Sequence, residues 1–211
     1  MKDNIYLSIF LKDDILVDDI EYPLFVKRDE SKKAYSLLFK MLDYLDLSVN
    51  ISDICCSDNG KPYIKNYKIR FNYSHSKKYI AVAIGFVEVG VDIEDEFDIS
   101  KDASSLYLPG IESDFRRVFV SKEAYCKLIG DFDDEFFKKL DINTITKNNY
   151  TISSDQYDLV IYYDGDIKKV NLILWIIFFF VYLSFVKSKK IWYYNHNKKN
   201  WVSSIFKILV I

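Results

Sequence analysis

The sequence predicts an α+β fold built from two similar halves and followed by an atypical apolar tail. Short runs rich in β-branched and aromatic residues predict strands in both halves, and each half has one stretch with the periodicity of an amphipathic helix. With 211 residues, 50% of them hydrophobic, the chain is long enough to bury a full core. This length allows one large domain or two small ones. Because strands and a helix recur in both halves, we expect two lobes, at 1–78 and 79–169, and a tail at 170–211.

The first half begins with strands and continues with a helix. Ile5 to Phe10 and Tyr22 to Val26 have the composition of strands. From Ser31 onward, apolar residues recur at helical spacing and form one stripe, which consists of Ala34, Leu37, Leu38, Met41, Leu42 and Leu45. This pattern predicts an amphipathic helix.

The second half repeats this order. Residues 79–87 and 89–94 predict two strands joined by a tight turn, and residues 114–129 predict a helix that ends at Gly130. Further strands are expected around 150–152 and 159–163. The residues between the strands and the helix, 98–112, are expected to form a loop.

Two acids share one face of the second predicted strand. Because side chains two apart on a strand point the same way, Asp92 and Glu94 lie together, while Val91 and Ile93 point into the core. Adjacent carboxylates repel each other unless a cation or a shared proton lies between them, and oxygen ligands suit Mg²⁺ bound to a phosphate. A solvated strand end, with further acids at 95, 96 and 98, is the alternative interpretation.

The predicted helix at 114–129 carries a polar stripe. Phe119, Glu123 and Lys127 are spaced by four and lie along one line, and Lys122 lies beside it. A glutamate and a lysine at this spacing often form an ordinary surface ion pair. Because the strand with the paired acids precedes this helix, the stripe can instead belong to the same site.

Four motifs follow one another in the order Gly60-Lys61-Pro62, Phe71-Asn72-Tyr73-Ser74-His75-Ser76, Val89-Gly90-Val91-Asp92-Ile93-Glu94, and aromatic-x-x-Lys-Glu-Ala-x-x-Lys-x-x-Gly at 119–130. In this order they resemble the motifs of the 4′-phosphopantetheinyl transferase superfamily, in its Sfp-like (surfactin-synthetase-activating) group. The resemblance covers residues 27 to 130.

The resemblance implies both a fold and an activity. The fold consists of two α/β lobes related by pseudo-twofold symmetry, with the active site in the cleft between them. The activity is the Mg²⁺-dependent transfer of 4′-phosphopantetheine from coenzyme A to a serine of an acyl or peptidyl carrier protein, which leaves 3′,5′-adenosine diphosphate. An apolar stretch of the loop, Leu106 to Pro109, is a candidate docking surface for that carrier protein, and the alternative is that it folds back on the core.

The resemblance also implies roles for individual residues. Asp92, Glu94 and Glu123 would hold the metal on the diphosphate of the coenzyme. Glu123, directly or through a water, would take the proton from the attacking serine.

Two further groups of residues would contact the coenzyme. Lys122 and Lys127 would neutralise the diphosphate while its bond to the departing nucleotide breaks. The nucleotide and phosphate pocket would be lined by Lys61, Pro62, Ser74 and His75. On chemistry alone, a single histidine between serines is more often a structural hydrogen-bonding residue.

The end of the chain departs from the family pattern, since residues 170–186 contain no charged side chain and residues 170–211 contain no Asp or Glu. Three explanations remain open: a short membrane-spanning helix, a pair of buried strands, or a foreign ending after a frameshift or truncation that replaces the closing strand. The abundance of Lys, Asn, Ile, Phe and Tyr favours the third. The alternative function is accordingly a membrane-associated binding protein, or an inactive truncated relative, anchored by residues 170–186.

Composition also bears on nucleic-acid binding, on location in the cell and on the state of the cysteines. A formal net charge of −2 and the lack of a recognisable module argue against nucleic-acid binding. The N-terminus lacks the basic region and long apolar core of a secretory signal, so we expect a cytoplasmic protein.

The three cysteines, Cys55, Cys56 and Cys126, form neither an even disulfide set nor a zinc spacing and are expected to be reduced. Two halves in one chain favour a monomer.

Overall fold

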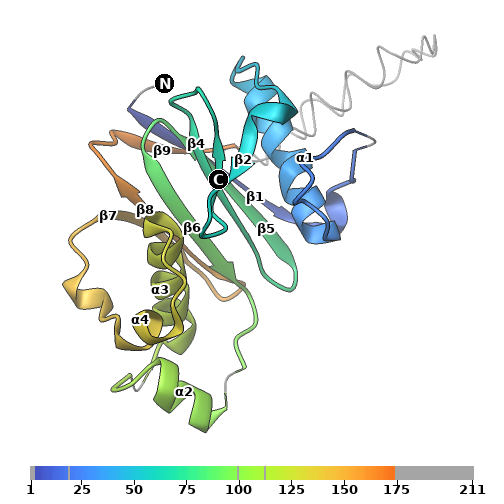
Figure 1. The fold of residues 1–211 in the computed structure, drawn as a ribbon. Coiled ribbons are helices and arrows are strands. Elements are labelled where there is room, and N and C mark those ends of the chain that lie inside the picture. The colour runs from blue at the N-terminus through green and yellow to red at the C-terminus, as the bar shows by residue number, and fades with distance from the viewer. Residues whose placement is uncertain (1–2, 19, 99, 112, 174–211) are drawn as a thin grey trace, which may run out of the picture. The chain divides into compact units, whose positions relative to one another are not determined.

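The computed structural model describes residues 3–18, 20–98, 100–111 and 113–173, and it has a mixed α+β fold. Within these residues, strands form three sheets and four α-helices accompany them (Figure 1). The predicted fold class is confirmed at this level.

The first sheet has the strand order β4-β5-β1-β9, with the bounds Arg70–His75, Tyr79–Gly85, Asn4–Leu11 and Lys169–Leu172. Strand β5 is antiparallel to both β4 and β1, whereas β9 runs parallel to β1. Helix α1 (Asp29–Tyr44) covers one face of this sheet, because its buried Tyr35, Leu38 and Met41 pack against Phe71 and Ile84 of the strands.

The second sheet is antiparallel and has the order β6-β8-β7, with the bounds Glu88–Glu94, Asp158–Asp164 and Asn148–Ser153. Helix α3 (Phe115–Ile129) covers its outer face. The contact consists of Val120, Ala124 and Leu128 against Val160 and Tyr162.

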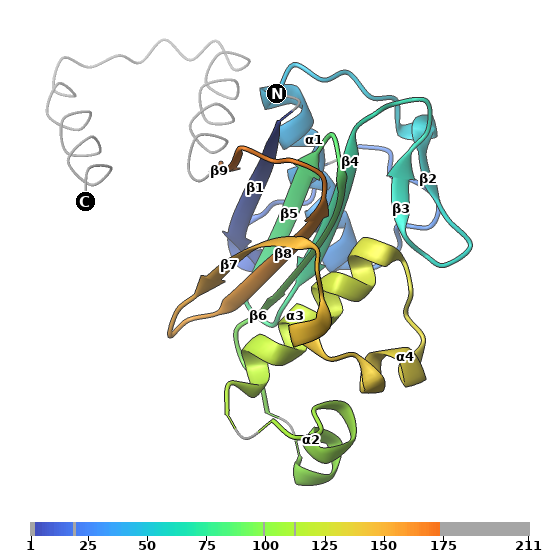
Figure 2. The same ribbon diagram turned by 90° about the vertical axis from the view of Figure 1, so that its left-hand side faces the viewer.

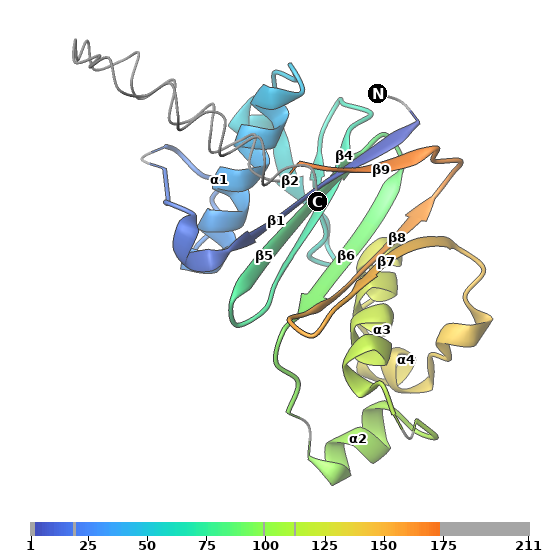
Figure 3. The same cartoon turned by 180° about the vertical axis from the view of Figure 1, so that it is seen from behind.

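The two larger sheets pack against each other through a third core. Ile5, Leu7 and Ala83 of the first sheet meet Val91 and Leu159 of the second, and all five are fully buried. The order of layers is therefore α1, first sheet, second sheet, α3, and the strands lie between the two helices in each view (Figures 1–3). The alternation along β6 is confirmed, since its Val91 and Ile93 point into this core.

Gly90 explains how closely α3 lies on β6. A Cβ atom added at Gly90 would come within 2.2 Å of the backbone oxygen of Ala124 and the backbone nitrogen of Leu128. No side chain can be accommodated there, because the atoms it would meet belong to the helix backbone and not to flexible side chains. The close packing of α3 on β6 thus explains why the third motif has a glycine at position 90.

Smaller elements surround these layers. A hairpin of β2 and β3 precedes β4, helix α2 lies between β6 and α3, and helix α4 follows α3. The bounds are Ile54–Cys56 and Pro62–Ile64 for the hairpin, Lys101–Tyr107 for α2 and Asp134–Lys139 for α4, with 3₁₀-helices at Lys12–Asp14, Ile51–Asp53 and Ile142–Thr144. All three cysteines are free thiols, as expected.

Three local predictions were wrong. Tyr22 to Val26 forms a turn and no strand, because Pro23 has no N–H for a ladder and its carbonyl accepts the N–H of Val26 at 2.8 Å. Residues 98–112 contain α2, whose start is capped by Ser100 Oγ accepting the N–H of Ala103 at 3.2 Å. The two strands at 79–94 exist, but they pair with other strands and not with each other.

The strand pairing also bears on the predicted segment boundaries. Strand β5 follows residue 78 yet pairs with β1 and β4, so the first sheet extends across the boundary between 1–78 and 79–169. Strand structure continues into the start of the predicted tail, because β9 extends to Leu172. Ile173 is buried, and its N–H donates to the backbone oxygen of Leu7 at 2.8 Å. The rest of the predicted tail, 174–211, lies outside the described residues. No helix in the described part of the chain has the length and apolarity needed to cross a bilayer.

Candidate functional site

One cavity of about 310 Å³ collects residues from all four motifs. These residues come from the β2–β3 hairpin, β4, β6 and α3, which are far apart in the sequence. Eight of the nine predicted site residues line it, namely Lys61, Pro62, Ser74, His75, Asp92, Glu94, Glu123 and Lys127.

The centre of this cavity is a network around the ammonium of Lys127. Its Nζ lies 2.6 Å from Asp92 Oδ1, 2.9 Å from Ser74 Oγ and 3.4 Å from Glu123 Oε2. Ser74 Oγ in turn donates to Asp92 Oδ1 at 2.5 Å. Although loss of hydration acts to lower the pKa of Lys127, the charges and hydrogen bonds of Asp92 and Glu123 outweigh it, so the pKa is raised and the amine stays protonated.

Acidic groups outnumber free basic groups at this centre. Asp92, Glu94 and Glu123 line the cavity together with Lys127, whereas the other lysine of the lining, Lys61, is paired with Glu88. Burial first, and then the charges of Asp92 and Glu123, raise the pKa of Glu94 to about 8. Burial and the charge of Asp92 also raise the pKa of Glu123. The site therefore favours either a proton or an added cation.

Asp92 has an oxygen without a partner. The residue is 1% exposed, and its buried Oδ2 accepts no hydrogen bond from any described residue. An unsatisfied buried charged oxygen is costly, which suggests that a ligand completes it. Together with the excess of carboxylates, this oxygen is compatible with Mg²⁺, which prefers oxygen ligands.

The predicted three-acid metal site is nevertheless not assembled. Among the described residues, no group of three or more His, Cys, Asp or Glu side chains converges as metal ligands would. The ammonium of Lys127 lies between Asp92 and Glu123, in contact with both carboxylates. The acids are gathered as predicted, but a lysine and not a shared centre joins them.

Lys122 does not belong to this site. Its side chain is 3% exposed, and its Nζ donates to the backbone oxygens of Tyr107, Phe137 and Lys138 at 2.8, 3.2 and 3.3 Å. Residues five apart are separated by about 140° around a helix, so Lys122 and Lys127 cannot face the same cavity. The prediction of a diphosphate contact was wrong, and Lys122 instead ties α2 and α4 to α3.

His75 is an exposed residue on the wall of the cavity. Partial loss of hydration of its ring, followed by the charge of Lys12, lowers its pKa, while the charge of Glu30 opposes this. In the free protein the ring is therefore mainly neutral near pH 7. A bound phosphate would have to raise the pKa to obtain the protonated contact that the resemblance implies.

Three residues that the sequence reasoning left out also shape the site. Asp95 carboxylate oxygens accept the backbone N–H groups of Lys77 and Lys78 at 3.1 and 3.0 Å, which fixes the turn after His75. Asn72 Oδ1 accepts the N–H of Val91 at 3.1 Å and so joins β4 to β6. Phe132 lines the cavity and is one of its walls.

A second cavity of about 350 Å³ adjoins the first, since Glu123 and Phe132 line both. Its other walls are mostly aromatic. Of the predicted docking stretch, Leu106 is 49% exposed, but Leu108 is 1% exposed and belongs to the core. A larger cavity of about 860 Å³ beside Arg116 contains none of the predicted residues.

Comparisons with known proteins add no family assignment. Neither a scan against models of protein families nor a search among curated proteins found a match.

Proposed function

We propose that the chain is a 4′-phosphopantetheinyl transferase that uses coenzyme A and a carrier protein as substrates and depends on Mg²⁺. The observation that carries the proposal is the single cavity lined by residues of all four motifs. The ordinary interpretations of these motifs are surface ion pairs and a solvated strand end. Neither interpretation requires the four motifs to meet in one place.

The chemistry needs charge neutralisation more than covalent help. The serine oxygen of the carrier protein forms a bond to the β-phosphorus, and the bond from that phosphorus to 3′,5′-adenosine diphosphate breaks. Lys127, kept protonated by its neighbours, would stabilise charge on the diphosphate. Asp92, Glu94 and Glu123 would hold the metal once the ammonium of Lys127, which contacts Asp92 and Glu123 in the structure, turns to the diphosphate. The metal would supply a further neutralising charge.

Glu123 is the candidate for moving the proton. Its side chain is 36% exposed and lines both cavities, so a serine can approach it from the second one. A raised pKa brings a carboxylate closer to the basicity that a general base needs near neutral pH.

The hydrogen bond between Ser74 and Lys127 suggests a serine–lysine nucleophile as a second chemistry. Two observations argue against it. Lys127 has a raised pKa and cannot accept the serine proton, and Ser74 Oγ already donates to Asp92.

We also propose that the layers correspond to two lobes with pseudo-twofold symmetry. Each large sheet has one long helix on its outer face, α1 on the first and α3 on the second. Motif residues on β4 and β6 then lie near the junction of the lobes, where Asn72 links the two strands.

The test is Mg²⁺-dependent labelling of purified carrier proteins by a fluorescent coenzyme A analogue. We expect labelling by the native chain, loss of labelling with a chelator, and a loss of about a hundredfold or more in Asp92→Ala, since one preorganised charge partner contributes about 3 kcal/mol to the barrier. Asp43→Ala, at an exposed aspartate of α1, is the matched control. Labelling at the native rate by the folded Asp92→Ala protein would contradict the proposal.

A further inference from the structure

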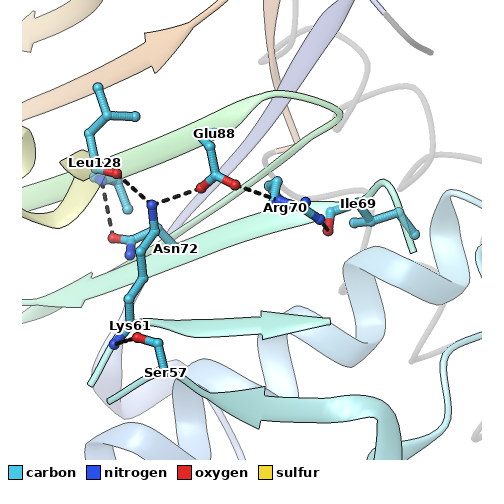
Figure 4. A network of polar contacts seen from close by, with 8 residues as sticks. Ser57, Lys61, Ile69, Arg70, Asn72, Glu88 and Leu128 are labelled. Atoms are coloured by element: carbon cyan, nitrogen blue, oxygen red, sulfur yellow. Dashed lines mark hydrogen bonds and ion pairs between the residues drawn. The ribbon is translucent and has the colours of Figure 1, made fainter. Parts of the chain in front are cut away.

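The ammonium of Lys61 is held by the protein itself. Its Nζ donates to the backbone oxygen of Leu128 at 2.6 Å and to Glu88 Oε2 at 2.8 Å (Figure 4). The first partner is one of the last carbonyls of α3, where the helix dipole favours a positive charge. The side chain is 16% exposed, so this lysine is largely withdrawn from solvent.

Glu88 is shared between two cations. Its Oε1 accepts from Arg70 Nε at 2.6 Å, while its Oε2 accepts from Lys61. Loss of hydration acts to raise the pKa of Glu88, but the hydrogen bonds and charges of Lys61 and Arg70 outweigh it and lower the pKa overall. Glu88 thus stays ionised near neutral pH and keeps both cations in place.

A second contact holds the same hairpin. Asn59 Nδ2 donates to the backbone oxygen of Gly130 at 3.0 Å, and the Lys61 side chain lies 3.7 Å from where a Cβ of Gly130 would be. A terminal carbonyl of α3 and the carbonyl of Gly130, which follows the helix, are therefore satisfied by side chains from the turn between β2 and β3. The hairpin is tied to the helix that carries Glu123 and Lys127.

We propose that Lys61 is a positioning residue and that Glu88, which no motif contains, is its partner. Together they hold the β2–β3 hairpin against the end of α3, and Pro62, the next residue, is thereby kept as a wall of the cavity. Lys61 acts on the ligand through this placement and not by direct contact with a phosphate. This inference rests on the proposed function for its ligand.

The test compares full-length Lys61→Met, Glu88→Ala, the double variant, and Lys68→Met as a control at an exposed lysine of the same segment. Calorimetry measures the binding of coenzyme A and of 3′-dephospho-coenzyme A. Lys61→Met and Glu88→Ala should each weaken both probes by the same factor, about tenfold, as for the loss of a hydrogen bond between charged groups. The double variant should bind no more weakly than Lys61→Met alone.

Glu88→Ala is the decisive variant. If Lys61 contacted a phosphate directly, removing the nearby carboxylate would free the ammonium and leave binding unchanged or tighter. That result, or a loss in Lys61→Met confined to coenzyme A and absent with the dephospho form, would overturn the inference.

A measurement without ligand separates the two proposals. Backbone amides of 54–64 should exchange with deuterium faster in Lys61→Met and in Glu88→Ala than in the native chain or Lys68→Met. If the native chain binds neither probe, the proposed function fails, while the exchange rates still decide whether Lys61 and Glu88 hold the hairpin. Unchanged exchange would contradict the inference by itself.

Discussion

Two lysines of helix α3 are both withdrawn from water, but their surroundings differ. Lys127 contacts the carboxylates of Asp92 and Glu123, whereas Lys122 contacts neutral backbone carbonyls and lies over the ring of Phe137, 5.5 Å from its centroid. The pKa of Lys127 is raised. The pKa of Lys122 is lowered, because loss of hydration is not offset by carboxylates in contact.

The difference separates a lysine suited to chemistry from one suited to packing. A protonated amine paired with carboxylates can exchange partners when a charged ligand enters. An amine that joins three carbonyls of other helices stabilises the fold and has no reason to move. Residue type and motif membership are the same in both cases, so the two lysines differ only in their position around the helix and in the partners that this position gives them.

The largest expected effect tests this contrast directly. Lys127→Met should lower carrier labelling about a hundredfold or more, because a preorganised positive charge at the diphosphate is lost. Lys122→Met should lower labelling per folded molecule much less. Circular dichroism of both variants checks that they fold, and equal losses in the two would remove the distinction.

The second effect concerns stability. Lys122→Met leaves the carbonyls of Tyr107, Phe137 and Lys138 without their donor, so the free energy of unfolding should fall by about 1–3 kcal/mol. Urea denaturation measures the change, and Lys139→Met, at an exposed lysine of α4, is the control. A neutral result would mean that the three contacts contribute nothing net.

The last effect is a pH dependence. Since the pKa of Glu94 rises from 4.5 to about 8 on folding, the folded state binds the proton more tightly, and stability should decline as pH rises through this interval. Glu94→Gln should flatten the decline, and exposed Glu21→Gln should change it less. Magnesium should stabilise the native chain more above pH 8 than below it. Urea midpoints across pH, with and without the metal, provide the measurement, and parallel profiles for native and Glu94→Gln chains would contradict the assignment.

The local sequence pattern was sufficient to predict much of the fold and of the candidate site. The alternation of Val91 and Ile93 with Asp92 and Glu94 determined which side chains face the core, and the stripe through Glu123 and Lys127 determined the helix face that meets them. Both depend on periods of the backbone, which a sequence displays directly.

The failures depend on information that one segment does not contain. The partners of β5 and β6 lie in distant strands, so a tight turn between them could not reveal that they belong to different sheets. Lys61 lines the cavity as the resemblance implied, but its partners, Glu88 and Leu128, come from other elements and no motif points to them. The wrong prediction of a diphosphate contact for Lys122 was avoidable, because residues 122 and 127 lie about 140° apart around a helix.

Gly90 has a consequence beyond packing. Since strand and helix touch there main chain to main chain, the spacing between the acid on β6 and the charged pair on α3 is set by atoms common to every amino acid. Substitutions in the surrounding core can change volume without altering that spacing, whereas one methyl group at position 90 would push the two halves of the charge cluster apart. Apart from the requirement for glycine at position 90, the dimension most critical to the proposed chemistry is thus the one least dependent on side-chain identity.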